Sequence, residues 1–279
     1  MELSKYKKPA LIASFAVLAI IGSTAAFLTS NDAADNTFTV AEVDLDIEEN
    51  FDENKTLSAG EIIQKQPWIK NTGNVDELFF AEVYVPCMET TLLDSAGQRI
   101  PPANFSGTPS TAADYRQTAE IFNLLAEGTP AKTYITEPVT TAGVTQNLEF
   151  SYNTGTAGAA GWYYMQQTQN KVVFHNKQGF QDGTYNAYLF GYSTAVAPGK
   201  KTIPIFDHLQ LRSMIDAEID SDSIGQVTIT GYTIQANELN LTGLTGSGSA
   251  SSPYTVTDLE KIYRVYENKA TTAQGGVSP

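Results

Sequence analysis

The chain is poor in the residues on which cystine-stapled scaffolds and zinc hydrolases depend, because it has one cysteine and two histidines. One cysteine cannot form an internal disulfide, which excludes a small secreted fold held together by cystines. We expect Cys87 to be a small buried side chain, with an intermolecular disulfide as the alternative. His175 and His208 lie far apart in the sequence, so the zinc-protease pattern of two histidines one helical turn apart is absent.

Positive charge is also scarce. The chain has 17 lysines and arginines against 31 aspartates and glutamates, with a formal net charge of −14. Nucleic acid and anionic membrane surfaces reward a basic face, so we do not expect either as a partner. The sequence also lacks a Gly-x-Ser-x-Gly elbow and a phosphate-binding glycine loop between a strand and a helix. These absences favour a protein that is not an enzyme and needs no cofactor.

The N-terminus has the layout of an export signal. Lysines precede an apolar run at residues 10–27, and small residues follow near its end. We predict a signal peptide at residues 1–26, with Ala25, Ala26 and Phe27 forming the cleavage region. An uncleaved anchor is the alternative, since the run is about as long as the shortest membrane span of roughly 17 residues. Either way, the protein is expected to be secreted, extracellular or on the cell surface.

The body of the chain predicts an all-β fold, a jelly-roll-like β-sandwich with a few short helices in insertions. β-branched and aromatic residues alternate in short runs that Gly, Asn, Asp or Pro interrupt. A bulge near Ala41 and Glu42 is needed to keep the first strand in phase, and Gly73 is expected to supply a positive φ in a turn at 71–74. The expected strands are 37–47, 61–70, 78–85, 132–139, 146–152, 162–166, 171–175, 185–193, 201–206 and 224–235.

The sandwich domain is expected at residues 43–240, with an insertion around 87–131. Within that insertion, apolar residues at helical spacing predict a helix over 114–127. A second stretch, 208–214, is expected to be helical or irregular. Beyond the domain we expect a Gly/Ser-rich linker, a short amphipathic helix with Asp258 or Thr257 as its cap, and a disordered tail; these are predicted at residues 241–256, 257–268 and 269–279.

Two acidic clusters are weak candidates for Ca²⁺ sites. Asp44 and Asp46 end the first expected strand, and Asp220 and Asp222 precede the last strong one. Carboxylates at alternate positions of an extended segment point to one face, where they can offer hard oxygen ligands. The alternative is a solvated acidic face that blocks pairing at a strand edge.

An aromatic run also leaves two interpretations open. Trp162, Tyr163 and Tyr164 could serve a surface adhesin or a carbohydrate-binding module. The alternative is that these residues belong to a strand of the core, where large aromatic side chains are common.

The N-terminal third resembles the TasA/camelysin family. The resemblance rests on the signal ending at 25–27, on residues 37–45, on 57–61, on the 68–74 stretch and on 78–85. It is best over residues 20–86 and weaker again at 224–235, whereas the middle of the chain departs in length and composition. The resemblance implies export through a SipW-type signal peptidase, a jelly-roll sandwich and a fibre-forming role in a bacterial biofilm matrix. Some members are labelled metallo-endopeptidases, but no catalytic residue can be carried over to this chain.

The resemblance also implies how subunits join. Residues 27–42 would act as a donor strand that inserts into the next copy of the chain, producing a head-to-tail homopolymer that other matrix proteins could join. Because such a contact is heterologous and need not close, it propagates into a filament. The assembly strand would carry Phe38, Val40, Val43 and Leu45. The alternative is that this segment only tethers the domain or pairs within its own sheet.

Overall fold

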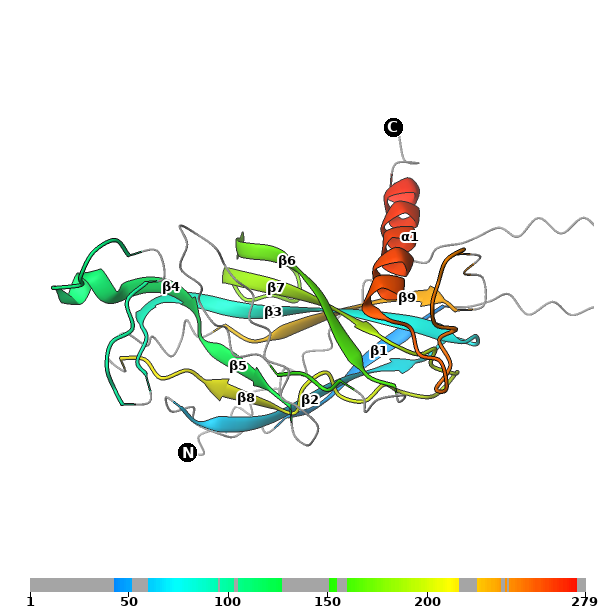
Figure 1. Cartoon of the computed structure of the whole chain (residues 1–279), viewed down its shortest axis with the longest axis horizontal. Helices are drawn as coiled ribbons and strands as arrows, with labels where there is room; N and C mark the ends of the chain where they lie inside the picture. The colour runs from blue at the N-terminus through cyan, green and yellow to red at the C-terminus, as the bar shows by residue number, and fades with distance from the viewer. Residues whose placement is uncertain are drawn as a thin grey trace, which may run out of the picture.

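Among the described residues the protein is an all-β sandwich of two curled antiparallel sheets with one α-helix on its outside (Figure 1). This confirms the predicted jelly-roll-like sandwich class. No helix among the residues described is long and apolar enough to cross a membrane. The predicted signal peptide at residues 1–26 and residues 27–42 lie outside the described residues. The structure, a computed structural model, describes residues 43–51, 60–94, 96–102, 105–126, 151–154, 160–215, 225–236, 239 and 241–274.

The first sheet has four strands in the order β1-β2-β8-β5. Its longest strand shows the burial period of two that a half-buried strand requires, with Ile63 and Ile69 facing the core and Ile62 exposed. The sheet therefore presents one apolar face. Its strands are β1 (Leu45–Phe51), β2 (Ile62–Asn71), β5 (Phe122–Leu125) and β8 (His208–Leu211).

The second sheet has five strands and is built around a single long strand, β3. One edge of β3 pairs with β7 and, beyond it, β6, whereas its other edge pairs first with β9 and then with β4. Two shorter strands thus share one edge of the longest strand. The members are β3 (Glu77–Thr91), β4 (Arg116–Glu120), β6 (Trp162–Phe174), β7 (Gly183–Tyr192) and β9 (Thr228–Gln235).

A proline is tolerated inside β3 because of this shared edge. The carbonyl oxygen of Pro86 accepts a hydrogen bond from Ile121 N–H at 3.1 Å, so that side of Pro86 faces the β9–β4 edge. Pairing with β9 ends at Tyr84 and pairing with β4 begins at Cys87. The missing N–H of Pro86 therefore falls between two ladders, where it interrupts neither.

The core lies between the two sheets and is rich in aromatic side chains. Phe79, Tyr188 and Phe190 from the five-stranded sheet pack against residues such as Ile69 of the other sheet, and all four are fully buried. The aromatic run at 162–164 begins with a core residue. Trp162 is fully buried between the sheets, and its indole N–H donates to Ile203 O at 2.9 Å. Trp162 is therefore not part of a surface that binds sugar rings.

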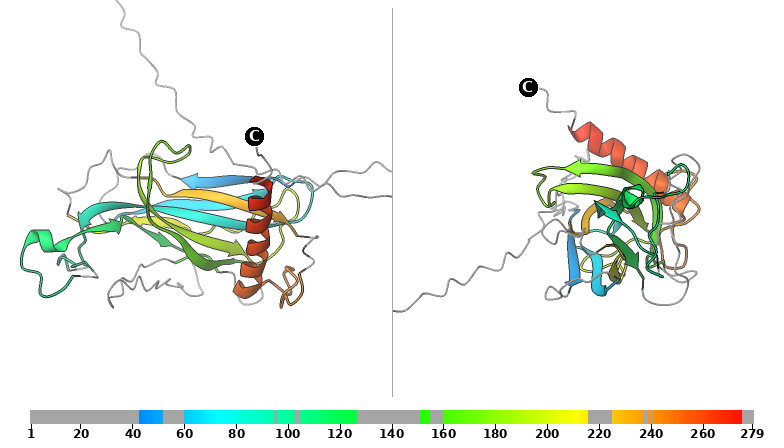
Figure 2. Two further views of the ribbon diagram at one scale, coloured as in Figure 1. Left: turned by 90° about the horizontal axis from the view of Figure 1, so that it is seen from above. Right: turned by 90° about the vertical axis from the view of Figure 1, so that its left-hand side faces the viewer.

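The helix α1 (Val256–Gln274) covers part of the outer face of the five-stranded sheet and runs across its strands (Figure 2). Leu259 and Ile262 pack on Phe80 and its outer-face neighbours. The helix extends beyond the predicted 257–268, so the expectation of disorder is wrong for residues 269–274. Its cap is Thr255 and not Asp258 or Thr257, because Thr255 Oγ1 accepts from the backbone N–H of Asp258 at 3.2 Å.

The predicted linker at 241–256 is wrong, because this stretch packs on the domain. Tyr254 is buried in the cluster beneath α1 and its N–H donates to Ser193 O at 2.7 Å. Gly248 O accepts from Ala195 N–H at 2.8 Å. Gly and Ser serve here as close-packing residues, since a Cβ on Gly248 would lie 2.4 Å from the Tyr254 ring.

The predicted helix at 114–127 is also wrong. A short 3-10 helix, η1 (Ala112–Tyr115), gives way to β4 and β5, which enter different sheets. The residues of β4 also fit the period of two of a strand, with Gln117 and Ala119 buried. Pairing with β3 makes this segment a strand rather than a helix. The insertion predicted at 87–131 is accordingly too long, because its first residues belong to β3 and its later ones to β4 and β5.

The remaining differences concern strand limits. The runs 162–166 and 171–175 form one strand, β6, with register shifts where it bulges. The stretch 208–214 contains β8, whereas 201–206 makes no strand beyond an isolated bridge at Lys201. The 71–74 stretch does turn the chain, but Gly73 is not among the glycines with positive φ. The strand predicted at 132–139, and 146–150 of the next one, lie outside the described residues.

Candidate functional site

The backbone is firmly held at Asp44, where the N-terminal segment joins the domain. The Asp44 N–H donates to Glu77 Oε1 at 3.1 Å, and its carbonyl oxygen accepts from the N–H groups of Thr72 and Gly73 at 3.1 and 3.3 Å. The Thr72 hydroxyl also donates to Asp44 Oδ2 at 2.9 Å. These bonds fix the point from which the preceding residues of the chain start.

Glu77 is the centre of this junction. Its side chain is fully buried and accepts a hydrogen bond from Thr233 Oγ1 of β9 at 2.6 Å, in addition to the one from Asp44. Burial raises the pKa of Glu77 to about 7, although both hydrogen bonds favour the charged form. One carboxyl group therefore ties the start of β1 to β3 and β9, and so joins the two sheets.

Two unpaired strand edges lie beside this junction. Within the described ranges, β1 pairs only with β2 and β9 pairs only with β3. The two strands lie side by side in both views (Figures 1 and 2), and a Cβ on Gly231 of β9 would lie 3.0 Å from Leu45 Cδ1 of β1. We call this side of the sandwich the β1/β9 seam. Its free N–H and C=O groups can accept an added strand.

Of the residues predicted for the assembly strand, only Val43 and Leu45 lie within the described residues. Leu45 is buried in the domain's own core and aligned with Asn71 of β2, so within a single copy it belongs to the four-stranded sheet. Val43 is half-buried just before β1. Phe38 and Val40 lie outside the described residues, as does the bulge expected near Ala41. The assembly strand stays a prediction for these residues.

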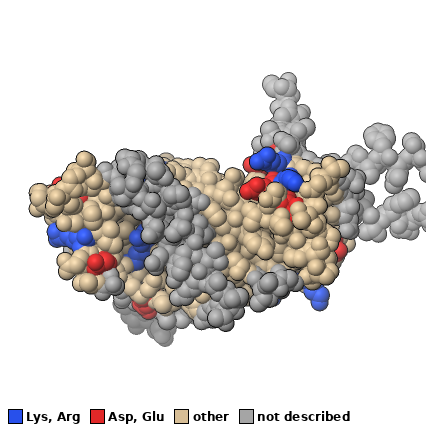
Figure 3. All heavy atoms as spheres, in the orientation of Figure 1, with Lys and Arg blue, Asp and Glu red and all other residues tan. Residues whose placement is uncertain are grey.

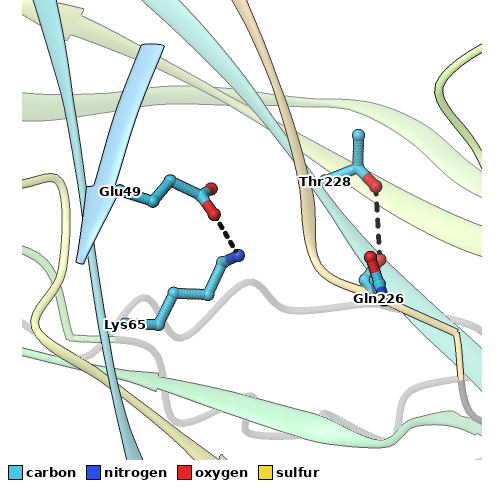
Figure 4. A network of polar contacts seen from close by, with 4 residues as sticks. All are labelled: Glu49, Lys65, Gln226 and Thr228. Atoms are coloured by element: carbon cyan, nitrogen blue, oxygen red, sulfur yellow. Dashed lines mark hydrogen bonds and ion pairs between the residues drawn. The ribbon is translucent and has the colours of Figure 1, made fainter. Parts of the chain in front are cut away.

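Two acidic residues of β1, Glu48 and Glu49, pair with side chains of β2. Glu48 accepts hydrogen bonds from Trp68 Nε1 at 2.7 Å and from Lys70 Nζ at 3.2 Å. These bonds, of which the one from Trp68 has the larger effect, hold the pKa of Glu48 below its usual value. Glu49 pairs with Lys65 at 2.7 Å (Figure 4). The sequence did not indicate these pairs, because they depend on the register between β1 and β2.

The calcium candidates are not brought together in the described residues. Asp46 is exposed, Asp44 binds Thr72, and Asp220 and Asp222 lie outside the described ranges. No group of three or more His, Cys, Asp or Glu side chains suited to a metal occurs in those ranges. On the face shown in Figure 3, charged side chains of the described residues gather near α1 and toward the opposite end of the molecule.

The other chemically distinctive residues are also separated. His175 lies in the loop between β6 and β7, where its Nδ1 is 2.5 Å from Asp182 Oδ2, and His208 begins β8. Cys87 is 8% exposed, which agrees with the prediction of a small buried side chain, and burial raises its pKa. Such a thiol is poorly placed for an intermolecular disulfide.

Comparisons of the chain with protein-family models, with curated proteins and with solved structures find no match. Function is therefore inferred from the residues and their geometry.

Proposed function

We propose that the mature protein is a secreted structural subunit of an extracellular matrix, which polymerises head to tail when residues 27–42 of one copy add as a strand to the next. The observation that carries the proposal is the β1/β9 seam beside the fixed junction at Asp44. An export-type N-terminus and the resemblance to the TasA/camelysin family over residues 20–86 support the same function.

Strand addition at the seam would stabilise the joint in two ways. The edge backbone groups of β1 or β9 would gain hydrogen bonds, each contributing about 0.5–1.5 kcal/mol net. Apolar side chains such as Phe38 would leave water, each contributing roughly 1.5–3 kcal/mol. A few contacts of each kind hold a durable joint, even after the ordering of the segment is subtracted.

Pairing within one chain competes with exchange between chains, because the segment starts at the seam that it would bind. The two arrangements differ in their dependence on concentration. Exchange between copies rises with protein concentration, whereas pairing within a chain does not. The joint in the polymer is heterologous, so every copy offers one donor segment and one acceptor edge and growth does not close.

The direct test uses purified protein beginning at Phe27 beside a version beginning at Val43. We expect filaments by electron microscopy and high oligomers by size-exclusion chromatography only from the longer protein. Phe38→Asp and Val40→Asp should leave the monomer folded and stop assembly. Thr39→Asp is the matched control, since it adds the same charge to the opposite face of an extended strand.

A second arm tests the acceptor edge directly. A synthetic peptide of residues 27–42 should bind the protein that begins at Val43 and, in excess, should cap growth of the longer protein. The same peptide with Asp at positions 38 and 40 should do neither. Fibres formed at the normal rate by the Phe38→Asp and Val40→Asp proteins, or monomers from both lengths, would overturn the proposal.

A further inference from the structure

The outer face of the five-stranded sheet carries a group of aromatic rings near the tip of the β6–β7 hairpin. Tyr84 of β3, Phe174 of β6 and Phe180 of the hairpin loop contact one another. The ring centroids are 4.8 Å apart for Tyr84–Phe180, 4.6 Å for Phe174–Phe180 and 5.6 Å for Tyr84–Phe174. Because neighbouring rings are steeply inclined to one another, these three residues form an angular cluster rather than a parallel stack. We call this group the aromatic cage.

A cation already sits on the cage. The ammonium nitrogen of Lys177 lies 3.9 Å from the centroid of Phe174, 4.2 Å from that of Phe180 and 5.2 Å from that of Tyr84. All three distances are within the range in which a ring attracts a cation. The partial loss of water lowers the pKa of Lys177, and the nearby charge of Glu82 opposes that shift. Phe174 and Phe180 are only half-buried, so the cage is open to solvent.

A fixed carboxylate lies beside the cage. Glu82 is 7% exposed and accepts hydrogen bonds from Tyr84 Oη at 2.5 Å, from Tyr232 Oη at 2.8 Å and from Thr168 Oγ1. Three hydroxyl donors from separate strands hold the carboxylate in place. Tyr84 is thus shared, because its ring forms a wall of the cage and its hydroxyl orients the carboxylate.

Lys177 is carried by a short loop that is tied down at its base. His175 and the backbone N–H of Asn176 both bind Asp182, at 2.5 and 2.7 Å, and Phe180 N–H donates to Lys177 O at 3.0 Å. Lys177 itself is an exposed residue. Its ammonium group can therefore leave the rings while the loop and the walls of the cage stay in place.

We propose that the aromatic cage is a binding site for an alkylammonium group, with Glu82 as its counter-charge and Lys177 as an internal occupant that an external ligand displaces. A quaternary ammonium suits such rings especially well, because it has no N–H groups that must remain hydrated. While Lys177 occupies the site, the apparent affinity for a ligand is reduced by the fraction of time that the cage is empty. Neither this site nor its ligand depends on strand exchange.

The test is a choline titration of the mature protein by isothermal titration calorimetry, which does not require a monomer, with wild type and Lys177→Ala compared at constant ionic strength. If Lys177 fills the cage for about nine-tenths of the time, its removal raises the apparent affinity about tenfold. The neutral isostere 3,3-dimethylbutanol is the matched ligand control and should not bind measurably. In the Lys177→Ala background, Phe180→Leu should abolish choline binding and Glu82→Gln should weaken it.

Tetramethylammonium and Nα-acetyl-lysine amide distinguish the source of the ammonium group, since one is a bare quaternary ion and the other imitates a protein side chain. Near-UV circular dichroism checks that each variant keeps its fold; Lys177→Ala changes an exposed residue and should not disturb it. The proposal is wrong if folded Lys177→Ala protein responds to choline no more than to the neutral isostere, or if its affinity equals that of wild type.

Discussion

The two faces of β3 are both buried, yet they are made of different chemistry. The inward residues Phe79, Ala81, Val83 and Val85 are apolar and fully buried against the other sheet. The outward face has Phe80 under α1 at one end, Tyr84 in the aromatic cage at the other, and the carboxylate of Glu82 between them. Between Phe79 and Val85 the face closed by the other sheet is apolar, whereas the face covered in pieces keeps a polar centre.

The largest expected effect on stability comes from removing a side chain of the inner face of β3. Phe79→Ala removes a fully buried ring and leaves a cavity between the sheets, so we expect a loss of about 3–5 kcal/mol in the free energy of unfolding. The outer-face control is Tyr84→Phe, which keeps the ring and leaves Glu82 with Tyr232 and Thr168 as donors. It should cost only about 0.5–1.5 kcal/mol. Urea denaturation measures both, and equal losses would contradict the difference between the faces.

The second effect is on the pH dependence of stability, and it concerns an acid on the inner face. Glu120 is almost fully buried; its Oε1 accepts from Asn186 Nδ2 at 2.6 Å and from the Tyr188 hydroxyl. Burial raises its pKa from 4.5 to about 7, although these bonds oppose the shift. Since the folded protein holds this proton more tightly, the contribution of Glu120 to stability is fully present below pH 4.5 and is lost as pH rises through about 7.

Glu120→Gln replaces this carboxyl group by an amide that does not titrate. By linkage, a shift of this size corresponds to a decline of up to about 3 kcal/mol per group, and Glu77 contributes in the same direction. We therefore expect the variant to lose stability less steeply between pH 4.5 and 7 than wild type does. Urea midpoints across that range test this, and parallel curves for the two proteins would show that Glu120 does not titrate there.

The sequence predicted the strands that are rich in β-branched and aromatic residues, including β2, the first half of β3 and β7. It failed at β4 and β5, where Tyr115, Ala119 and Phe122 satisfy a helical spacing as well as a strand one, and pairing with β3 and β8 decides. It also missed Glu77 and Glu82, because their partners Asp44, Tyr232 and Thr168 come from other strands. Such sites depend on register and topology, which no local pattern contains.

The smallest effect tests the cover of the outer face. Asp258 Oδ2 accepts from the N–H groups of Thr255 and Gly246 at 3.1 and 3.0 Å, and Oδ1 accepts from Thr245 N–H at 2.8 Å. Burial alone would raise the pKa of Asp258, but these backbone donors outweigh it and lower the pKa to about 2. Its contribution is therefore present above pH 3.8 and lost as pH falls toward 2.

Asp258→Ala should cost about 0.5–2 kcal/mol at neutral pH, because it opens the capping box of α1 and releases the loop at 245–246. Thr257→Ala is the matched control, since Thr257 is exposed one residue away, and it should change stability by less than about 0.5 kcal/mol. Thermal denaturation at pH 7 compares them. Because α1 covers only the outer face, loss of its cap should change the surroundings of the Phe80 ring and leave those of the Phe79 ring unchanged, which NMR of the two side chains measures. Equal changes at both rings would mean that the two faces respond as one unit.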